Sequence, residues 1–162
     1  MKVDVYERLW LWMASIMIVI FLGAVLIGAG AHMIHPPSHL ETIDPEKVLT
    51  ESEFAYPGPG VEYLDDGTVL VRMVSKMFVF EPASVHLPAG VDVTFRMTSP
   101  DVIHGFQVVR TNTNAMVVPG YITQFTTRFD KPGEYLVLCN EYCGLSHHLM
   151  QARLIVEEAP TP

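Results

Sequence analysis

The chain has 162 residues, of which 49% are hydrophobic, and its formal net charge is −8 at pH 7. This length is sufficient for one domain with a hydrophobic core and one further element. The acidic balance argues against nucleic acid as a partner and is typical either of a soluble surface or of one that attracts a basic protein.

Residues 9–31 form an uncharged apolar run, which predicts a transmembrane helix. At about 1.5 Å per residue such a helix spans roughly 35 Å, more than the bilayer core of about 30 Å. A cleaved signal peptide is the alternative, because Ala29-Gly30-Ala31 offers a small-x-small site, but signal peptides have apolar regions of only about 7–15 residues. Lys2 and Arg8 precede the run and no Lys or Arg follows it before Lys47, so we expect a cytoplasmic N-terminus and an exported remainder.

The predicted anchor, residues 1–35, is followed by a predicted linker over residues 36–60, a β domain over residues 61–158 and a tail over residues 159–162. The linker is acidic and ends in the turn-forming run Pro57-Gly58-Pro59-Gly60. We interpret His32, His35 and His39 as interfacial residues, because the Pro-Pro pair after His35 prevents a continuous helix from placing them on one face.

Beyond residue 60 the sequence alternates strand-like runs with turns. Residues 69–80 are rich in β-branched and aromatic side chains, and residues 91–97 alternate apolar with polar ones, the period of a half-buried strand. Two further strands are expected at residues 135–139 and 152–156, and turns at residues 88–90, 119–120 and 131–133. Several short strands with no soluble helix predict a β-sandwich or barrel.

The only two cysteines lie in the run CNEYCGLSHHLM, where Cys139, Cys143, His147 and Met150 follow one another at steps of four, four and three. Thiolate and thioether ligands select soft metals, and imidazole suits copper and zinc. His104, in the upstream segment SPDVIHGF, offers a second imidazole. This set favours copper over zinc, because methionine is a poor zinc ligand and a familiar weak axial ligand of copper.

A disulfide is the main alternative for a Cys-x-x-x-Cys pair in an exported domain, because that compartment is oxidising. A disulfide accounts for neither His147 nor Met150. A mononuclear blue-copper site needs one thiolate and leaves one cysteine unused. Two thiolates that bridge two copper ions leave each ion one imidazole and one weak axial donor, and we expect the second axial donor to be the backbone carbonyl of Glu141.

The segments SPDVIHGF, PGEY and CNEYCGLSHHLM, together with a single N-terminal anchor, resemble subunit II of haem-copper cytochrome c oxidases. The resemblance covers nearly the whole chain and is strongest to the B-type enzymes, whose subunit II has one transmembrane helix. It implies a mainly β, cupredoxin-like Greek-key β-sandwich or barrel after the anchor, and it implies that this domain carries the dinuclear copper A centre.

The resemblance also assigns the metal ligands by position. Two cysteines bridge both copper ions, and each ion is completed by one imidazole and one weak donor. The bridges are Cys139 and Cys143, and the completing pairs are His104 with Met150 and His147 with the carbonyl of Glu141. His148 matches no ligand position.

The function implied by the resemblance is an electron relay. The chain would accept electrons from cytochrome c or a cupredoxin and pass them to haem in subunit I, so it is an enzyme only as part of the O2-reducing complex. Implied partners are subunit I, possible small additional membrane subunits and the electron donor. The implied location is the plasma membrane, with the copper domain on its outer face.

Three further residues match positions of interest in that family, and Asp101 lies next to the His104 segment. The Glu141 side chain matches one that in many members ligates a magnesium ion at the subunit I interface. Phe78 and Phe80 match aromatic residues near the point of electron entry, although strand aromatics are commonly part of the core. Asp101 is either a hydrogen-bond partner of His104 or a turn residue.

Two other functions fit parts of the pattern. A copper A domain related to nitrous-oxide reductase shares the motif, but it normally belongs to a larger soluble enzyme with another copper cluster. A membrane-anchored copper-delivery or storage protein needs exchangeable, exposed ligands, whereas the nine methionines here are scattered. A quinol-oxidase subunit II would share the fold and lack the two cysteines.

Overall fold

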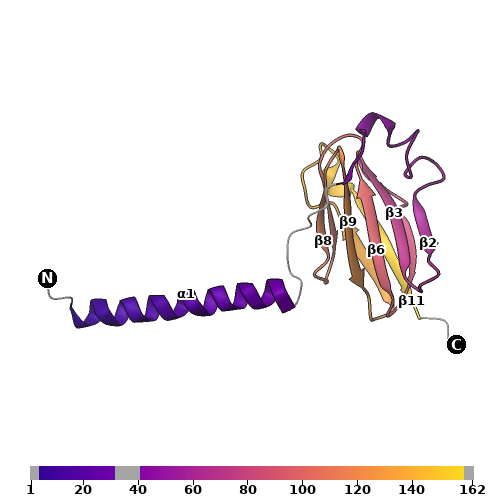
Figure 1. Cartoon of the computed structure of the whole chain (residues 1–162). Coiled ribbons are helices and arrows are strands. Elements are labelled where there is room, and N and C mark those ends of the chain that lie inside the picture. The colour runs from indigo at the N-terminus through magenta and orange to yellow at the C-terminus, as the bar shows by residue number, and fades with distance from the viewer. Residues whose placement is uncertain (1–3, 32–40, 159–162) are drawn as a thin grey trace. The chain divides into compact units, whose positions relative to one another are not determined.

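The structure, a computed structural model, describes residues 4–31 and 41–158 and divides the chain into two compact units, Met1–His39 and Leu40–Pro162 (Figure 1). The three histidines of the predicted linker, His32, His35 and His39, lie outside the described residues. Their interfacial role therefore stays a prediction.

Helix α1, Val5–Ala31, is the element predicted as the membrane anchor. Within the described residues it is the one helix long and apolar enough to cross a membrane. The mean hydropathy of its most apolar 18-residue window, within Val5–Gly30, is 2.5. None of this 18-residue window is buried. A helix that is apolar on all its faces and not buried is suited to a lipid environment, as predicted.

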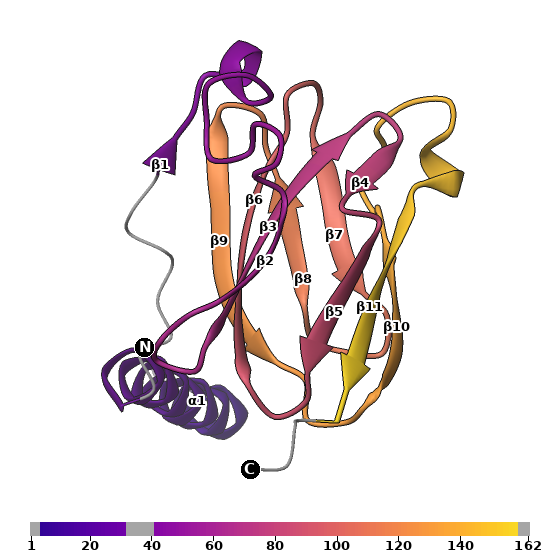
Figure 2. The same ribbon diagram turned by 90° about the vertical axis from the view of Figure 1, so that its right-hand side faces the viewer.

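The second unit consists of two β-sheets (Figure 2). The six-stranded sheet has the order β1 (Glu41–Thr42), β9 (Tyr121–Arg128), β6 (Asp92–Thr98), β3 (Val69–Lys76) and β2 (Gly60–Tyr63), with β4 (Val79–Glu81) paired to β3. The five-stranded sheet has the order β5 (Ser84–Pro88), β11 (Gln151–Glu157), β10 (Gly133–Leu138), β7 (His104–Val108) and β8 (Asn114–Val117). The pairs β3–β6 and β5–β11 are parallel, and the other pairs are antiparallel.

The core lies between the two sheets and is built from alternate residues of their strands. In β6 the buried apolar side chains are Val93, Phe95 and Met97, which is the alternation that the sequence predicts, and Thr98 at the end of the strand is also buried. Four phenylalanines from both sheets pack with ring centroids 5.4–6.1 Å apart: Phe80, Phe95, Phe106 and Phe125. The predicted mainly β sandwich is confirmed, although the run predicted as one strand over residues 69–80 is divided by a turn between β3 and β4.

Residues 41–59, here called the strap, pack onto the six-stranded sheet, although the sequence predicted a linker there. Strand β1 pairs with β9, and the one-turn helix η1 (Pro45–Lys47) follows it. Val48 and Phe54 are buried in a small cluster with Val74 of β3. The compact unit thus begins at Leu40, before the predicted boundary at residue 61. The sequence does not predict this packing, because Val48 and Phe54 are isolated apolar residues in an acidic segment and form no periodic pattern.

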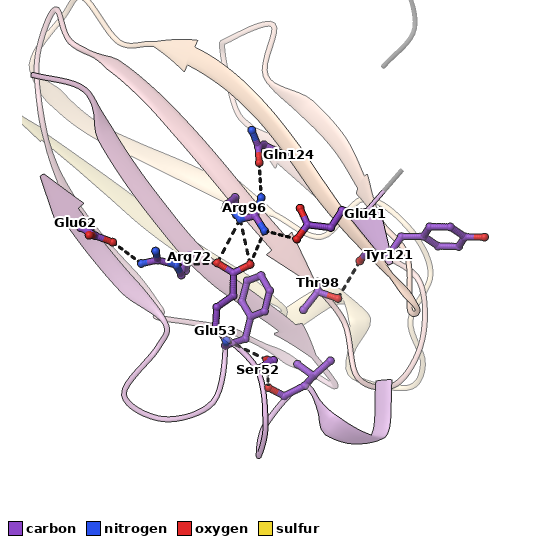
Figure 3. A network of polar contacts seen from close by, with 11 residues as sticks. Glu41, Ser52, Glu53, Glu62, Arg72, Arg96, Thr98, Tyr121 and Gln124 are labelled. Atoms are coloured by element: carbon purple, nitrogen blue, oxygen red, sulfur yellow. Dashed lines mark hydrogen bonds and ion pairs between the residues drawn. The ribbon is translucent and has the colours of Figure 1, made fainter. Parts of the chain in front are cut away.

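Ion pairs fasten the strap to the sheet beside this cluster (Figure 3). The Glu53 carboxylate accepts hydrogen bonds from Arg72 Nε at 2.9 Å and from the guanidinium of Arg96, which also bonds Glu41. Burial raises the pKa of the Glu53 carboxyl, but the hydrogen bonds and charges of Arg96 and Arg72 outweigh burial and hold it below its usual value. Glu53 therefore remains charged at neutral pH and pairs with two strands at once.

We expect Phe54→Ala to destabilise the β domain by about 3–5 kcal/mol, because it removes a buried aromatic side chain and leaves a cavity. Tyr56→Ala is the matched control, since Tyr56 belongs to the same strap and is 92% exposed. Thermal unfolding of both variants, followed by the β-sheet circular dichroism signal, measures the difference. Equal unfolding temperatures for the two variants would contradict the packing of the strap.

Candidate metal centre

The predicted ligands lie on two segments that strand pairing brings together. His104 is the first residue of β7, and the Cys loop, residues 139–150, joins β10 to β11. Leu138 at the end of β10 is paired with Gln151 of β11 and with Gln107 of β7. The Cys139 amide donates to the carbonyl of Met150 at 3.2 Å, which closes the base of the loop.

The sulfur and nitrogen donors are grouped within this loop and beside it. Cys139 Sγ lies 3.8 Å from Cys143 Sγ and 3.9 Å from His104 Nδ1. Cys143 Sγ lies 3.5 Å from His147 Nδ1 and 3.7 Å from Met150 Sδ. The carbonyl oxygen of the sixth predicted ligand, Glu141, is 3.2 Å from Cys139 Sγ.

These separations fit donors that share metal ions. A zinc-sized ion bonded to sulfur at about 2.3 Å and to nitrogen at about 2.0 Å keeps the two donors no more than about 4.3 Å apart. All the donor separations above are below that limit, and the ligand atoms of His104, Cys139 and Cys143 lie within 4.8 Å of one another. Two thiols, two imidazoles and a thioether are a soft donor set of the kind that copper prefers.

The two neighbouring histidines after the second cysteine have different surroundings. His147 begins the one-turn helix η2 (His147–Leu149), is half-buried and turns Nδ1 toward Cys143. The ring of Tyr142 lies 5.8 Å from the ring of His147, centroid to centroid. His148 is exposed. The geometry therefore agrees with His147 as the residue that faces the thiols.

Asp101 is both a turn residue and a partner of His104, which resolves the alternative left open by the sequence. Its Oδ1 lies 2.8 Å from His104 Nε2, and its carboxylate also accepts from the amides of Met77 and Val102. Burial raises the pKa of Asp101, but the hydrogen bonds from His104, the two amides and Ser99 hold it below its usual value. The group facing His104 is thus a carboxylate.

The two predicted entry aromatics occupy different environments. Phe80 is buried in the core, edge-on to Phe106 at 5.9 Å. Phe78 is half-buried in the turn after β3, and its ring packs on Gly144 of the Cys loop, where an added Cβ would lie 2.8 Å from Phe78 Cε1. Gly144 also has φ +132°, a conformation that other residues rarely adopt.

Protonation of the metal-free Cys143 thiol follows from its surroundings. Burial, the hydrogen bond to Cys139 and the charge of that neighbour raise the pKa of the Cys143 thiol to about 11. Both cysteines are free in the structure, without a disulfide between them. Because metals bind thiolates, metal uptake at neutral pH has to release a proton from Cys143.

Comparison with known proteins assigns the family. The family model described as cytochrome c oxidase subunit II, periplasmic domain, matches residues 65–158. A cytochrome c oxidase subunit 2 of Thermus thermophilus is 35% identical over 155 residues, which are 94% of this chain and 92% of that relative. The chain belongs to the cytochrome c oxidase subunit II family. The family predicted from the sequence is confirmed.

Solved structures agree with this assignment. A chain of a haem-copper terminal oxidase dimer superposes with a TM-score of 0.69 at 27% identity, covering 94% of this chain and 99% of that one. The periplasmic domain of subunit II of the Bradyrhizobium japonicum oxidase has a TM-score of 0.51 at 17% identity, over 55% of this chain and 83% of that one, and so supports the cupredoxin-like fold alone. A nitrous-oxide reductase of Cupriavidus necator is 29% identical over 125 residues, which are 72% of this chain and only 19% of that enzyme.

Gly105 lies next to the metal centre, and the sequence analysis did not single it out. It follows His104 in β7, and an added Cβ would lie 2.9 Å from the backbone nitrogen of Asn140 and against its side chain. The pairing of β7 with β10 predicts that these residues face each other, since Gln107 is opposite Leu138. A small residue here allows the His104 segment to approach the Cys loop closely.

We expect Gly105→Ala to destabilise the β domain by about 1–3 kcal/mol, because the added methyl group meets the Asn140 backbone, which cannot rotate away. Gly28→Ala in α1 is the control, since an added Cβ there meets nothing within 4 Å. Thermal unfolding of the metal-free chains measures both effects. Unchanged stability in Gly105→Ala would show that the two segments are not held this closely.

Proposed function

We propose that this chain is the electron-accepting subunit of a haem-copper cytochrome c oxidase and that its outer domain holds a dinuclear copper A centre. The observation that carries the proposal is the pair of buried thiols 3.8 Å apart, each with an imidazole nitrogen within 3.9 Å. A mononuclear copper site needs one thiolate, whereas two bridging thiolates need such a pair. As a family member the chain is an enzyme only within the oxidase complex.

Each donor has a proposed place. Cys139 and Cys143 would bridge two copper ions, since each sulfur has two further donors beside it. The completing pairs are His104 with Met150 and His147 with the carbonyl of Glu141. The contacts of each sulfur support this set, because His104 and Glu141 lie next to Cys139 while His147 and Met150 lie next to Cys143.

When bound, two copper ions that share one unpaired electron supply a site that gains and loses single electrons. The contribution of the chain is to hold the donors in a buried, packed frame, so that their positions change little when the charge changes. The proposed donors occupy the ligand positions of both ions, so we expect no O2 to bind in this chain. The relay then accepts electrons from cytochrome c or a cupredoxin and passes them to haem in subunit I.

Electron entry is proposed at Phe78. Its half-buried ring packs on Gly144, the residue that follows Cys143 in the Cys loop. Phe80, in contrast, is buried in the core. Met77, next to Phe78, is 49% exposed. An electron-donor protein that contacts this turn would approach the Cys loop closely. Phe80 would support the turn from the core side.

The proposed membrane arrangement follows α1. One pass through the plasma membrane, with the N-terminus in the cytoplasm, leaves the copper domain on the outer face, bound to subunit I and to a small additional membrane subunit. Within the described residues the Glu141 carboxylate makes neither an ion pair nor a hydrogen bond. This supports its availability for a magnesium ion at the interface with subunit I.

We expect the chain starting at Glu41 to bind two copper ions and to give an EPR signal spread over two equivalent copper nuclei. Cys143→Ser should abolish this signal, because one bridge cannot hold both ions in the same delocalised state. Met150→Leu is the milder comparison, since it deletes only a weak axial donor and should retain copper. A single-copper, four-line signal in the fully loaded protein would contradict the dinuclear proposal.

His147→Ala should disrupt the centre, whereas His148→Ala should leave its absorption and EPR spectra nearly unchanged. Only His147 directs a ring nitrogen at Cys143, while the adjacent His148 is exposed. The two variants differ by one position in the same helical turn, so they control for each other. The opposite pattern of spectra would mean that the proposed ligand is the wrong histidine.

Two other functions fit less well. A delivery or storage protein exchanges its copper through accessible ligands, but both thiols, Met150 and His104 are buried here. The nitrous-oxide reductase relative shares only a small part of its length with this chain, and α1 gives this chain a candidate membrane anchor. Rapid electron transfer from the loaded centre to subunit I, with no loss of copper to a chelator on the same timescale, distinguishes the relay from a copper carrier.

A further inference from the structure

The two nitrogens of His104 have different partners, and this difference sets the form of the ring. Nδ1 faces Cys139 Sγ at 3.9 Å, and Nε2 lies 2.8 Å from Asp101 Oδ1. His104 is fully buried, so no water competes for either nitrogen. Since a carboxylate accepts hydrogen bonds and does not donate them, the proton of the neutral ring belongs on Nε2 and the lone pair of Nδ1 points toward the thiols.

Asp101 is itself held from several directions. The amide of Met77 donates to its Oδ2 at 2.7 Å, and the amide of Val102 donates to Oδ1 at 2.6 Å. The single proton of the Ser99 hydroxyl is shared between Oδ1, at 3.0 Å, and the carbonyl oxygen of Val102, at 2.7 Å. These donors also keep the pKa of the carboxyl below its usual value against the opposing effect of burial. The carboxylate therefore has little freedom to leave His104.

Met77 connects this carboxylate to the other ligand segment. Met77 and Phe78 form the turn between β3 and β4, which lies at the same end of the domain as η2 (Figure 2). The amide of Met77 bonds Asp101, while the ring of Phe78 packs on Gly144, midway along the Cys loop. One turn thus contacts the support of His104 on one side and the loop that carries the other ligands on the opposite side.

His147 lacks comparable support. It is half-buried, and within the described part of the chain its Nε2 makes no hydrogen bond; its ring is next to the exposed Tyr142. Only one of the two imidazoles is therefore fixed by a charged partner. A carboxylate that accepts the outer proton of an imidazole makes the ring a stronger electron donor to a metal and fixes its orientation.

We propose that Asp101 is a positioning residue of the metal centre: it fixes the tautomer and basicity of His104, and the Met77–Phe78 turn holds it in register with the Cys loop. This inference rests on the proposed function, since it treats His104 as a copper ligand. Asp101 thereby lowers the reduction potential of the centre, because a more basic imidazole stabilises the more highly charged, oxidised copper.

The test is Asp101→Asn in the full chain, purified in detergent and titrated with copper. The amide has nearly the same shape but lacks the charge, so His104 loses its strong acceptor. We expect copper affinity to fall about 10–100-fold, and we expect the reduction potential, measured by redox titration of the copper absorption, to rise.

Asp65→Asn is the matched control, because it removes the same charge from an exposed aspartate. Asp65 precedes β3, whose eight residues separate it from Met77 by about 26 Å. The control should match the wild-type chain in both copper affinity and reduction potential. A control that shifts as far as Asp101→Asn would assign the effect to overall charge and overturn the proposal.

Ser99→Ala gives a second reading if Asp101→Asn does not fold. It removes a hydroxyl that the Asp101 carboxylate shares with the carbonyl of Val102 and leaves His104 in contact, so the carboxylate accepts more strongly from the ring and the potential should fall. A purely structural role for Asp101 predicts lower stability and an unchanged potential in folded variants, and that result overturns the proposal. If the wild-type chain fails to bind two copper ions, the proposed function fails, which is a separate outcome.

Discussion

The pairing of β10 with two neighbours, β7 on one side and β11 on the other, is the constraint on which the metal centre depends. Leu138 has a register partner in each neighbour, so the residue that follows it, Cys139, is held near both His104 and Met150. Strand register moves in whole residues, and a slip by one residue turns every side chain to the opposite face. The core behind these strands, with its cluster of phenylalanines, makes such a slip costly. The packed sheet, rather than the loop itself, therefore determines the positions of the donors.

The centre is enclosed unequally. On one side His104 is buried and held by Asp101, which is in turn held by three donors of the chain; on the other side His147 is near the surface with a tyrosine ring beside it. A relay has to combine a rigid interior, which limits rearrangement on each electron transfer, with an edge that a partner can approach. The Met77–Phe78 turn belongs to both, because its amide supports the buried side and its side chains lie at the partly exposed rim.

The sequence predicts the parts of this protein whose signals are local. Ligand spacing in the Cys loop, the apolar run of α1 and the alternation in β6 are each contained in a short window, and the structure has the corresponding elements. The strap was mistaken for a linker because burial of Val48 and Phe54 depends on Val74, which is distant in sequence. The same holds for Gly105, whose need for a small side chain arises from Asn140, and for Asp101, whose role depends on the Met77 amide. Phe78 and Phe80 are separated by one residue yet differ in environment, because a turn intervenes before β4.

The parallel pairing of β5 with β11 determines when the domain can be completed. Val85 is the partner of Leu154, so β5 has to wait for the final strand of the chain before its backbone groups on that side are satisfied. Pairs this distant in sequence close late and slowly, because the intervening chain has to be ordered first. The hairpin of β10 and β11, which closes the Cys loop, requires the same final strand but joins segments that are close in sequence. During synthesis and export, the two thiols therefore emerge before the strand that seals their domain, and they spend that interval unprotected in whatever redox environment receives the chain.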